Sequence, residues 1–172
     1  MQPIITPYIG VDPGTSGAIA ALDINRSLWV AAAPVEVVEK ANGERTEICR
    51  ERMRNLAEML FFQGYSHAIV EGVGGMKKDG ASRAFNFGTT TERMAGAFWY
   101  AGCATRTVSP QRWKGYYRLL GKPKSASVER ALIEFPDAAE FFTPKRLVRT
   151  AAQCEGNAEA ALIALYGALH HA

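Results

Sequence analysis

The chain has 172 residues, of which 48% are hydrophobic and 22% are charged, and its formal net charge is +3. This length is enough to bury one sizeable core, so we expect a single domain over residues 1–172. The apolar stretches are too short to cross a bilayer and no signal-peptide pattern opens the chain, so we expect a cytoplasmic protein. Three widely spaced cysteines without a Cys-x-x-Cys pair indicate reduced structural thiols rather than a zinc site: Cys49, Cys103 and Cys154.

The first half of the chain predicts three strands, a helix and a fourth strand. Residues 5–12 and 17–23 are apolar runs joined by a Pro-Gly turn, and 27–34 follows after a short connection, which predicts an antiparallel meander. Residues 45–64 predict a helix that stops at Gly64, because one helical face collects Met53, Leu56, Ala57, Leu60 and Phe61. The sequence HAIVE at 67–71 then predicts a short buried strand.

The second half predicts four helical regions and one strand. Residues 72–88 are rich in glycine, and Thr89 with Glu92 forms a capping-box pattern that predicts a helix from there to about Tyr100. A strand at 105–108, a helix start at Ser109 and Pro110, a helix at 125–135 and a last helix ending near His170 follow. No repeat or linker divides the chain, so the order βββ-α-β-α-β-α indicates a mixed α/β fold.

The positive charge is concentrated in one segment. Residues 101–150 contain ten lysines and arginines against four acids, a local charge of +6, which leaves −3 for the rest of the chain. This division suits a partner that carries phosphates, held by the basic part near a site that needs carboxylates. Chance clustering on a solvated surface is an equally good account of the charge alone.

Four acids are placed where a sheet-based site would need them. Asp12 ends the first predicted strand and Glu71 ends the fourth, while Glu155 and Glu159 are four residues apart on the last helix, where like charges repel. A divalent cation such as Mg²⁺ would neutralise such a group, because hard cations prefer oxygen ligands. Three of the acids also have an ordinary structural interpretation, Asp12 as a turn residue and Glu155 and Glu159 as solvated helix residues. Glu71 is less ordinary, because an unpaired carboxylate that closes a buried strand is costly.

Six blocks of the sequence together resemble the RuvC-type Holliday-junction resolvases, and the phage-type branch more than the cellular enzymes. These blocks are IGVDPGTSGAIA (9–20), IVEGV (69–73), FNFGTTTERMAGAFW (85–99), VSPQRWK (108–114), KPKSASVERALIEFP (122–136) and EGNAEAALIALYG (155–167). The resemblance implies a ribonuclease-H-like fold, with a mixed five-stranded sheet whose first three strands are antiparallel and are flanked by helices. It also implies a homodimer that cleaves four-way and other branched DNA with Mg²⁺ or Mn²⁺, in the host-cell cytoplasm if a phage encodes it.

Carried over by position, the resemblance implies a metal site made of Asp12, Glu71, Glu155 and Glu159, with Lys124 as a further catalytic residue. DNA contacts are expected from the basic side chains of Lys77, Lys78, Arg83, Arg112, Lys114, Lys122 and Lys124. The sequence departs from the cellular enzymes in two places. Two glutamates four apart replace two aspartates three apart, and Gly74 stands where those enzymes place an aromatic residue. Any base stacking would then fall to Phe85 or Phe87, although each is better interpreted as a core residue.

The chemistry of phosphodiester hydrolysis leads to the same site. Two metal ions about 4 Å apart lower the pKa of the attacking water and stabilise the leaving oxygen, and four carboxylates suffice to hold them. Asp12 is the expected bridging ligand, and Lys124 would screen charge developing on the phosphate. By the resemblance, the products carry 5′-phosphate and 3′-hydroxyl ends.

Because one chain supplies one site and a junction needs two cuts, we expect a dimer paired through the helix at 91–100, with Met94, Phe98 and Trp99 as candidate contacts.

Two other functions remain open from the sequence. The stretch DPGTSG is also similar to the first phosphate-binding turn of sugar kinases and actin-like ATPases, but those proteins need a second lobe for which 172 residues leave no room. A non-catalytic protein that binds branched DNA on the same fold is the other alternative, which the two glutamates in the last block keep open.

Overall fold

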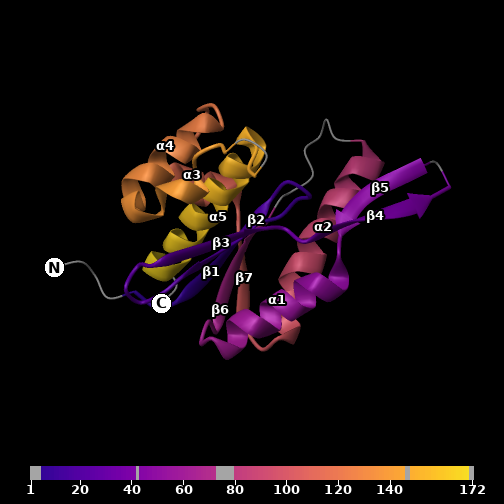
Figure 1. Ribbon diagram of the computed structural model, residues 1–172, viewed down its shortest axis with the longest axis horizontal. Coiled ribbons are helices and arrows are strands. Elements are labelled where there is room, and N and C mark those ends of the chain that lie inside the picture. Colours follow the sequence, from indigo (N-terminus) through magenta and orange to yellow (C-terminus); the bar gives the residue numbers. More distant parts are fainter. Residues whose placement is uncertain (1–4, 42, 73–79, 146–147, 171–172) are drawn as a thin grey trace.

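A five-stranded mixed sheet lies between two groups of helices (Figure 1). The computed structural model describes residues 5–41, 43–72, 80–145 and 148–170, with the side chains of 81–83 left out. The strand order is β3-β2-β1-β6-β7, where β1 pairs antiparallel with β2 and parallel with β6. The strands are β1 (Tyr8–Asp12), β2 (Ala18–Leu22), β3 (Leu28–Ala32), β6 (His67–Glu71) and β7 (Ala104–Val108). The predicted antiparallel meander and mixed sheet are confirmed.

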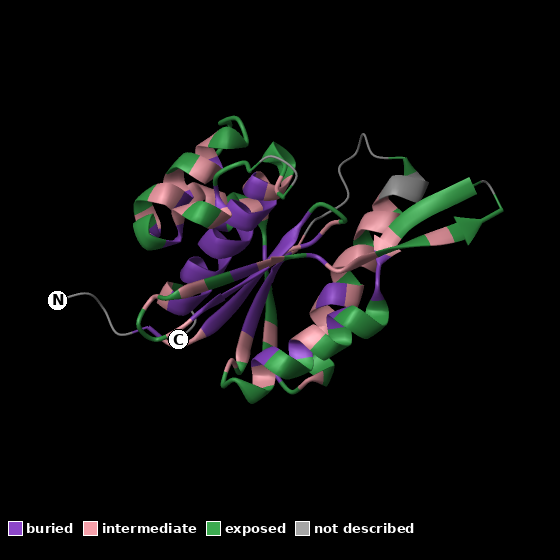
Figure 2. Ribbon diagram, in the orientation of Figure 1, coloured by how far each residue is buried: buried purple, intermediate pink, exposed green. Residues whose placement is uncertain are grey.

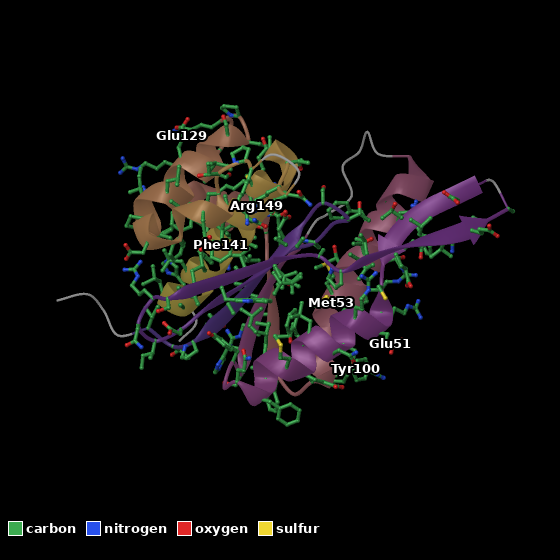
Figure 3. The ribbon with its side chains drawn as sticks, viewed as in Figure 1. Glu51, Met53, Tyr100, Glu129, Phe141 and Arg149 are labelled. Atoms are coloured by element: carbon green, nitrogen blue, oxygen red, sulfur yellow. The ribbon has the colours of Figure 1, made fainter. Side chains whose placement is uncertain are left out.

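The helices divide between the two faces of the sheet. One face carries α1 (Arg50–Phe62) and α2 (Ala81–Tyr100), and the other carries α3 (Pro110–Tyr116), α4 (Ser125–Glu134), the 3-10 helix η1 (Pro136–Phe141) and α5 (Ala151–His170). Each face has its own core, because successive strand residues point to opposite sides. In β6, for example, Ile69 packs under α5 whereas Ala68 and Val70 pack under α1 and α2. Figure 3 labels two residues of α1: Met53, which is buried in the core between the sheet and α1 and α2, and Glu51, which is exposed.

α5 is the most deeply buried helix of the described chain. Figure 2 shows its central turns and the inner strands as buried, whereas α4 and α1 show much exposed surface. Gly10 permits the close approach of α5 to β1, since an added Cβ would stand 2.2 Å from the carbonyl oxygen of Ala160. This contact brings the first turns of α5 over the carboxyl end of β1.

The predicted helix at 45–64 begins too early. The structure starts α1 at Arg50, and residues before it form a hairpin of β4 (Val35–Lys40) and β5 (Gly43–Ile48), which the sequence analysis missed. Gly43 has a φ of 108°, a conformation that favours glycine, and Glu47 of β5 forms an ion pair with Arg93 of α2 at 2.8 Å. The hairpin therefore extends beside α2 instead of prolonging α1 (Figure 1).

The predicted capping box at Thr89 is also wrong. α2 begins at Ala81, so Thr89 lies inside the helix, where its hydroxyl donates to the Phe85 carbonyl at 2.8 Å. Thr90 makes the same bond to Asn86 at 2.9 Å. Both threonines satisfy their hydroxyls four residues back in their own helix, so neither caps its start.

The remaining elements follow the predictions within a few residues. The strand expected at 105–108 begins at Ala104, the helix expected at 125–135 ends at Glu134, and the last helix ends at His170 as expected. All three cysteines are buried and unbridged, in agreement with structural thiols. Within the described residues, no helix is long and apolar enough to span a membrane.

Candidate active site

Asp12 and Glu71 lie side by side at one end of the sheet. β1 and β6 are parallel neighbours in which Val11 stands opposite Val70, and the two acids are the next residues of the two strands. Both strands alternate between the two cores, and both acids fall on the side that faces α5. The fold thus places two carboxylates together under the first turns of α5, as the sequence analysis predicted for adjacent strand ends.

Glu159 joins them from α5. It is buried, and its Oε1 accepts hydrogen bonds from the Lys114 ammonium at 2.9 Å and from the Ser127 hydroxyl at 3.2 Å. Lys114 comes from α3 and Ser127 from the first turns of α4, so three helices meet at this one carboxylate. Ser127 was not among the predicted site residues, because a serine inside a helical pattern gives no sign of a partner on another helix.

Glu71 has a neutral partner. The Trp113 indole donates from Nε1 to Glu71 Oε1 at 2.9 Å, and both side chains are buried. Trp113 also stood outside the predicted site, although it belongs to the VSPQRWK block. Its neighbour Lys114 holds Glu159, so consecutive residues of α3 hold two acids that come from β6 and α5.

The pKa values of these groups show that the acids act on one another. Burial raises the pKa of Asp12 well above its ordinary value, and the charges of Glu159 and Glu71 raise it further, against Lys124 and Lys114. Burial likewise raises the pKa of Glu71, while the Trp113 hydrogen bond opposes the shift. Burial is therefore the main reason that both carboxyls resist ionisation, and the charges of the neighbouring acids add to it.

Lys114 has the opposite balance. Burial disfavours its charged form, but the hydrogen bond and charge of Glu159, with the charges of Glu71 and Asp12, outweigh burial and raise the pKa of Lys114. The ammonium therefore stays charged and stands beside the acids as their nearest positive partner. We call Asp12, Glu71 and Glu159 the acidic cluster.

Glu155 stands apart from the acidic cluster in the described interactions. It is half-buried and lies one turn before Glu159. Its charge adds to the burial that raises the pKa of the Cys154 thiol. The position that faces Asp12 is the next one, because an added Cβ on Gly156 would stand 3.4 Å from Asp12 Oδ2.

The donor chemistry of the acidic cluster fits a hard divalent cation, since it offers carboxylate oxygens whose mutual repulsion a cation would relieve. In their described positions, however, no three acidic, histidine or cysteine side chains of the described chain are close enough to hold one ion. Side-chain adjustment would have to accompany cation binding.

The predicted basic residues surround this site unevenly. Lys124 is exposed just before α4, and its charge partly offsets the rise that burial causes in the pKa of Asp12 and Glu71. Arg112 on α3 and Lys122 in the α3–α4 connection are also exposed. Lys77 and Lys78 lie outside the described residues, as does Gly74, and Arg83 lies in the first turn of α2, where its side chain is not described.

The candidate dimer helix differs from its prediction. Met94 and Phe98 are fully buried in the core between α2 and the sheet, so they are unavailable to a partner, whereas Trp99 is 63% exposed.

The core interpretation of Phe85 is wrong, because its side chain is 74% exposed, while Phe87 is half-buried. Phe85 lines a groove of about 780 Å³ between α1 and α2, which extends to Tyr100, labelled in Figure 3.

No protein-family model and no curated protein sequence matches the chain. Among solved structures, the Thermus thermophilus RuvC in complex with Holliday junction substrate is similar with a TM-score of 0.55 and 17% identity, over 96% of this chain and 94% of that chain. A second Thermus thermophilus RuvC structure has a TM-score of 0.46 and 15% identity, over 95% of this chain and 98% of that chain. The chain therefore has the RuvC-like, ribonuclease-H-like fold that its sequence blocks predict.

Proposed function

We propose that this protein is a divalent-metal-dependent endonuclease that cuts Holliday junctions and other branched DNA, in the manner of the phage-type branch. The observation that carries the proposal is the acidic cluster, which lies at the carboxyl ends of β1 and β6 with Lys114 and Lys124 beside it. A site that combines buried and half-buried acids with adjacent cations suits a phosphodiester, because the acids can hold metal while the cations attract the phosphate.

The chain's own residues divide this work. Asp12 and Glu71 project from inner strands of the sheet and would be cation ligands, joined by Glu159 and Glu155 from α5. Lys124 is exposed and would bind the phosphate and screen the charge that develops on it. Arg112, Lys122, Lys77, Lys78 and Arg83 would hold the flanking DNA.

A pair of Mg²⁺ or Mn²⁺ ions, when bound, would supply an activated water and stabilise the leaving oxygen, giving 5′-phosphate and 3′-hydroxyl ends. The chain would contribute the ligands and exclude bulk water on the α5 side of the site, where Trp113 closes the core.

The test is cleavage of an end-labelled four-way junction and of a linear duplex of matched sequence, with Mg²⁺, with Mn²⁺ and with chelator. We expect cation-dependent cuts in the junction and little cutting of the duplex. Asp12→Asn should abolish cleavage and keep junction binding, whereas Asp137→Asn, the same change at an exposed position, should cut as the parent does. Near-normal cutting by Asp12→Asn would remove the proposed site.

A second candidate, a protein that binds branched DNA without cutting it, is favoured by one observation. The described acids are not close enough to hold one ion, and Lys114 occupies an oxygen of Glu159. The same assay separates the two functions, because a pure binding protein shifts the junction in a gel and leaves it uncut at every cation concentration.

A homodimer completes the proposal, because two-fold symmetry supplies two sites for two symmetric cuts. The exposed aromatic side chains of α2 are the candidate contacts, with Tyr100 82% exposed at one end of the groove and Phe85 along it. Sedimentation equilibrium should give twice the 18.7 kDa of the chain. Phe85→Glu should give a monomer and Ile133→Glu, on α4, should not; a parent monomer that still makes paired cuts would contradict the dimer.

A further inference from the structure

We propose that Trp113 is a positioning residue, whose indole N–H fixes the orientation of the Glu71 carboxylate within the acidic cluster. This inference rests on the proposed function, because it concerns how one expected metal ligand is held. It adds a residue from the short helix α3 that contributes neither charge nor a ligand atom to the site.

The contact geometry supports a fixed orientation. Trp113 Nε1 and Glu71 Oε1 are 2.9 Å apart, and the two side chains are 0% and 6% exposed. A strand-end carboxylate can rotate about its last side-chain bond, and this single buried hydrogen bond selects one rotation. With Oε1 engaged, Oε2 is the oxygen that remains to be offered to a cation.

Trp113 is itself held on several sides. Its ring packs edge to face against Tyr117, with centroids 6.5 Å apart, and the Lys114 ammonium lies 4.9 Å from its centroid. It also belongs to the core under α5. A donor fixed this firmly can orient its acceptor, because neither partner has room to move independently.

The choice of donor distinguishes Glu71 from Glu159. Indole N–H is neutral and can only donate, so it cannot compete with a cation for charge or become a ligand. Glu159 is held instead by the Lys114 ammonium and the Ser127 hydroxyl, and the ammonium does compete with a cation. The structure therefore assigns Glu71 as the acid oriented by a neutral donor before cation binding, and Glu159 as the acid whose carboxylate a cation would share with the Lys114 ammonium.

An isosteric replacement of the indole N–H tests this without opening a cavity. The chain has three tryptophans, and Trp29→Phe with Trp99→Phe leaves only Trp113, which is then replaced by benzothienylalanine, an analogue with sulfur in place of N–H. Mg²⁺ binding is measured by isothermal titration calorimetry on the tryptophan and analogue proteins in the same background. Tyr117→Phe is the matched control, since it removes a buried donor that reaches the Leu162 carbonyl and no acid.

We expect the analogue to weaken Mg²⁺ binding about tenfold or more. Its thermal unfolding midpoint should fall, because a buried acceptor loses its donor, and the titration is run well below that midpoint. Tyr117→Phe, which also loses a buried hydrogen bond, should leave Mg²⁺ affinity unchanged. In junction cleavage, the analogue protein should have a lower kcat and an unchanged KM. As a spectroscopic check, the Trp113 indole N–H resonance should move on Mg²⁺ addition and lose that response in Glu71→Gln. Equal Mg²⁺ affinity with and without the N–H would overturn the role of Trp113 alone, whereas a parent that binds no Mg²⁺ would overturn the proposed function as well.

Discussion

Gly156 of α5 lies directly over the Asp12 carboxylate: a Cβ added there would stand 3.4 Å from Asp12 Oδ2 and 2.7 Å from the carbonyl oxygen of Ser16. The second distance is too short for any real contact, so the helix can sit at this depth only with glycine at position 156. The approach of α5 to the turn after β1 thus determines both the burial of Asp12 and the closeness of Glu159.

The first prediction follows from this contact. Gly156→Ala should destabilise the protein by about 1–3 kcal/mol, because backbone must move to admit the methyl group. Gly115→Ala in α3 is the control, since its added Cβ would make only an ordinary 3.6 Å contact with Leu120. Thermal unfolding of both variants decides; a Gly156→Ala protein as stable as the parent would contradict the close approach of α5.

A second prediction concerns Asp12 and pH. Because its folded-state pKa is raised, the protonated form is favoured by folding, and that contribution is complete below the unfolded pKa of about 3.9 and is lost as pH rises through the folded value. Asp12→Asn should therefore unfold at a higher temperature than the parent at pH 7 in chelator, and the difference should vanish near pH 3.5. A constant difference at all pH values would contradict the assigned shift.

The sequence located the acids because strand periodicity and strand ends are local properties. Asp12 and Glu71 each close an apolar run, and parallel pairing of those runs brings them together. Glu159 follows from the same reasoning on a helix. Glu155 was placed by the same helical spacing; it is half-buried one turn before Glu159, and its role as a cation ligand stays a prediction.

The partners of the acids were not predictable in the same way. Trp113 reads as an apolar core residue and Ser127 as an ordinary helix residue, and their hydrogen bonds appear only when α3 and α4 dock against α5 and β6. The β4–β5 hairpin was missed for a similar reason. Its second strand carries charged residues that also suit a helix, and its pairing register becomes visible only with its partner strand.

A third prediction concerns Lys114. Lys114→Met leaves the buried Glu159 carboxylate with the Ser127 hydroxyl as its remaining partner among the described residues, which should cost about 1–2 kcal/mol of stability in chelator. Mg²⁺ should recover more stability in this variant than in the parent, because a cation would replace the missing positive charge. Unfolding midpoints with and without Mg²⁺ measure both effects.

Lys40→Met is the control for this variant, since Lys40 forms a more exposed ion pair with Glu47 on the hairpin. Its loss should change stability by less than about 0.5 kcal/mol with no Mg²⁺ dependence. Equal Mg²⁺ stabilisation of the parent and Lys114→Met would show that the ammonium and the cation do not share Glu159.

The last prediction concerns how DNA is held. If the basic residues around α3 and α4 contact phosphates, log affinity for a four-way junction should fall steeply with log salt concentration, measured in chelator by fluorescence anisotropy. Lys124→Ala should make this slope shallower by about one unit, because one phosphate contact is lost. Lys40→Ala, which removes the same charge from the hairpin, should leave the slope unchanged. Both variants lose one positive charge, so a difference between their slopes reports the position of the lysine and not the net charge of the protein. Identical slopes for the two variants would place the junction somewhere other than over the acidic cluster.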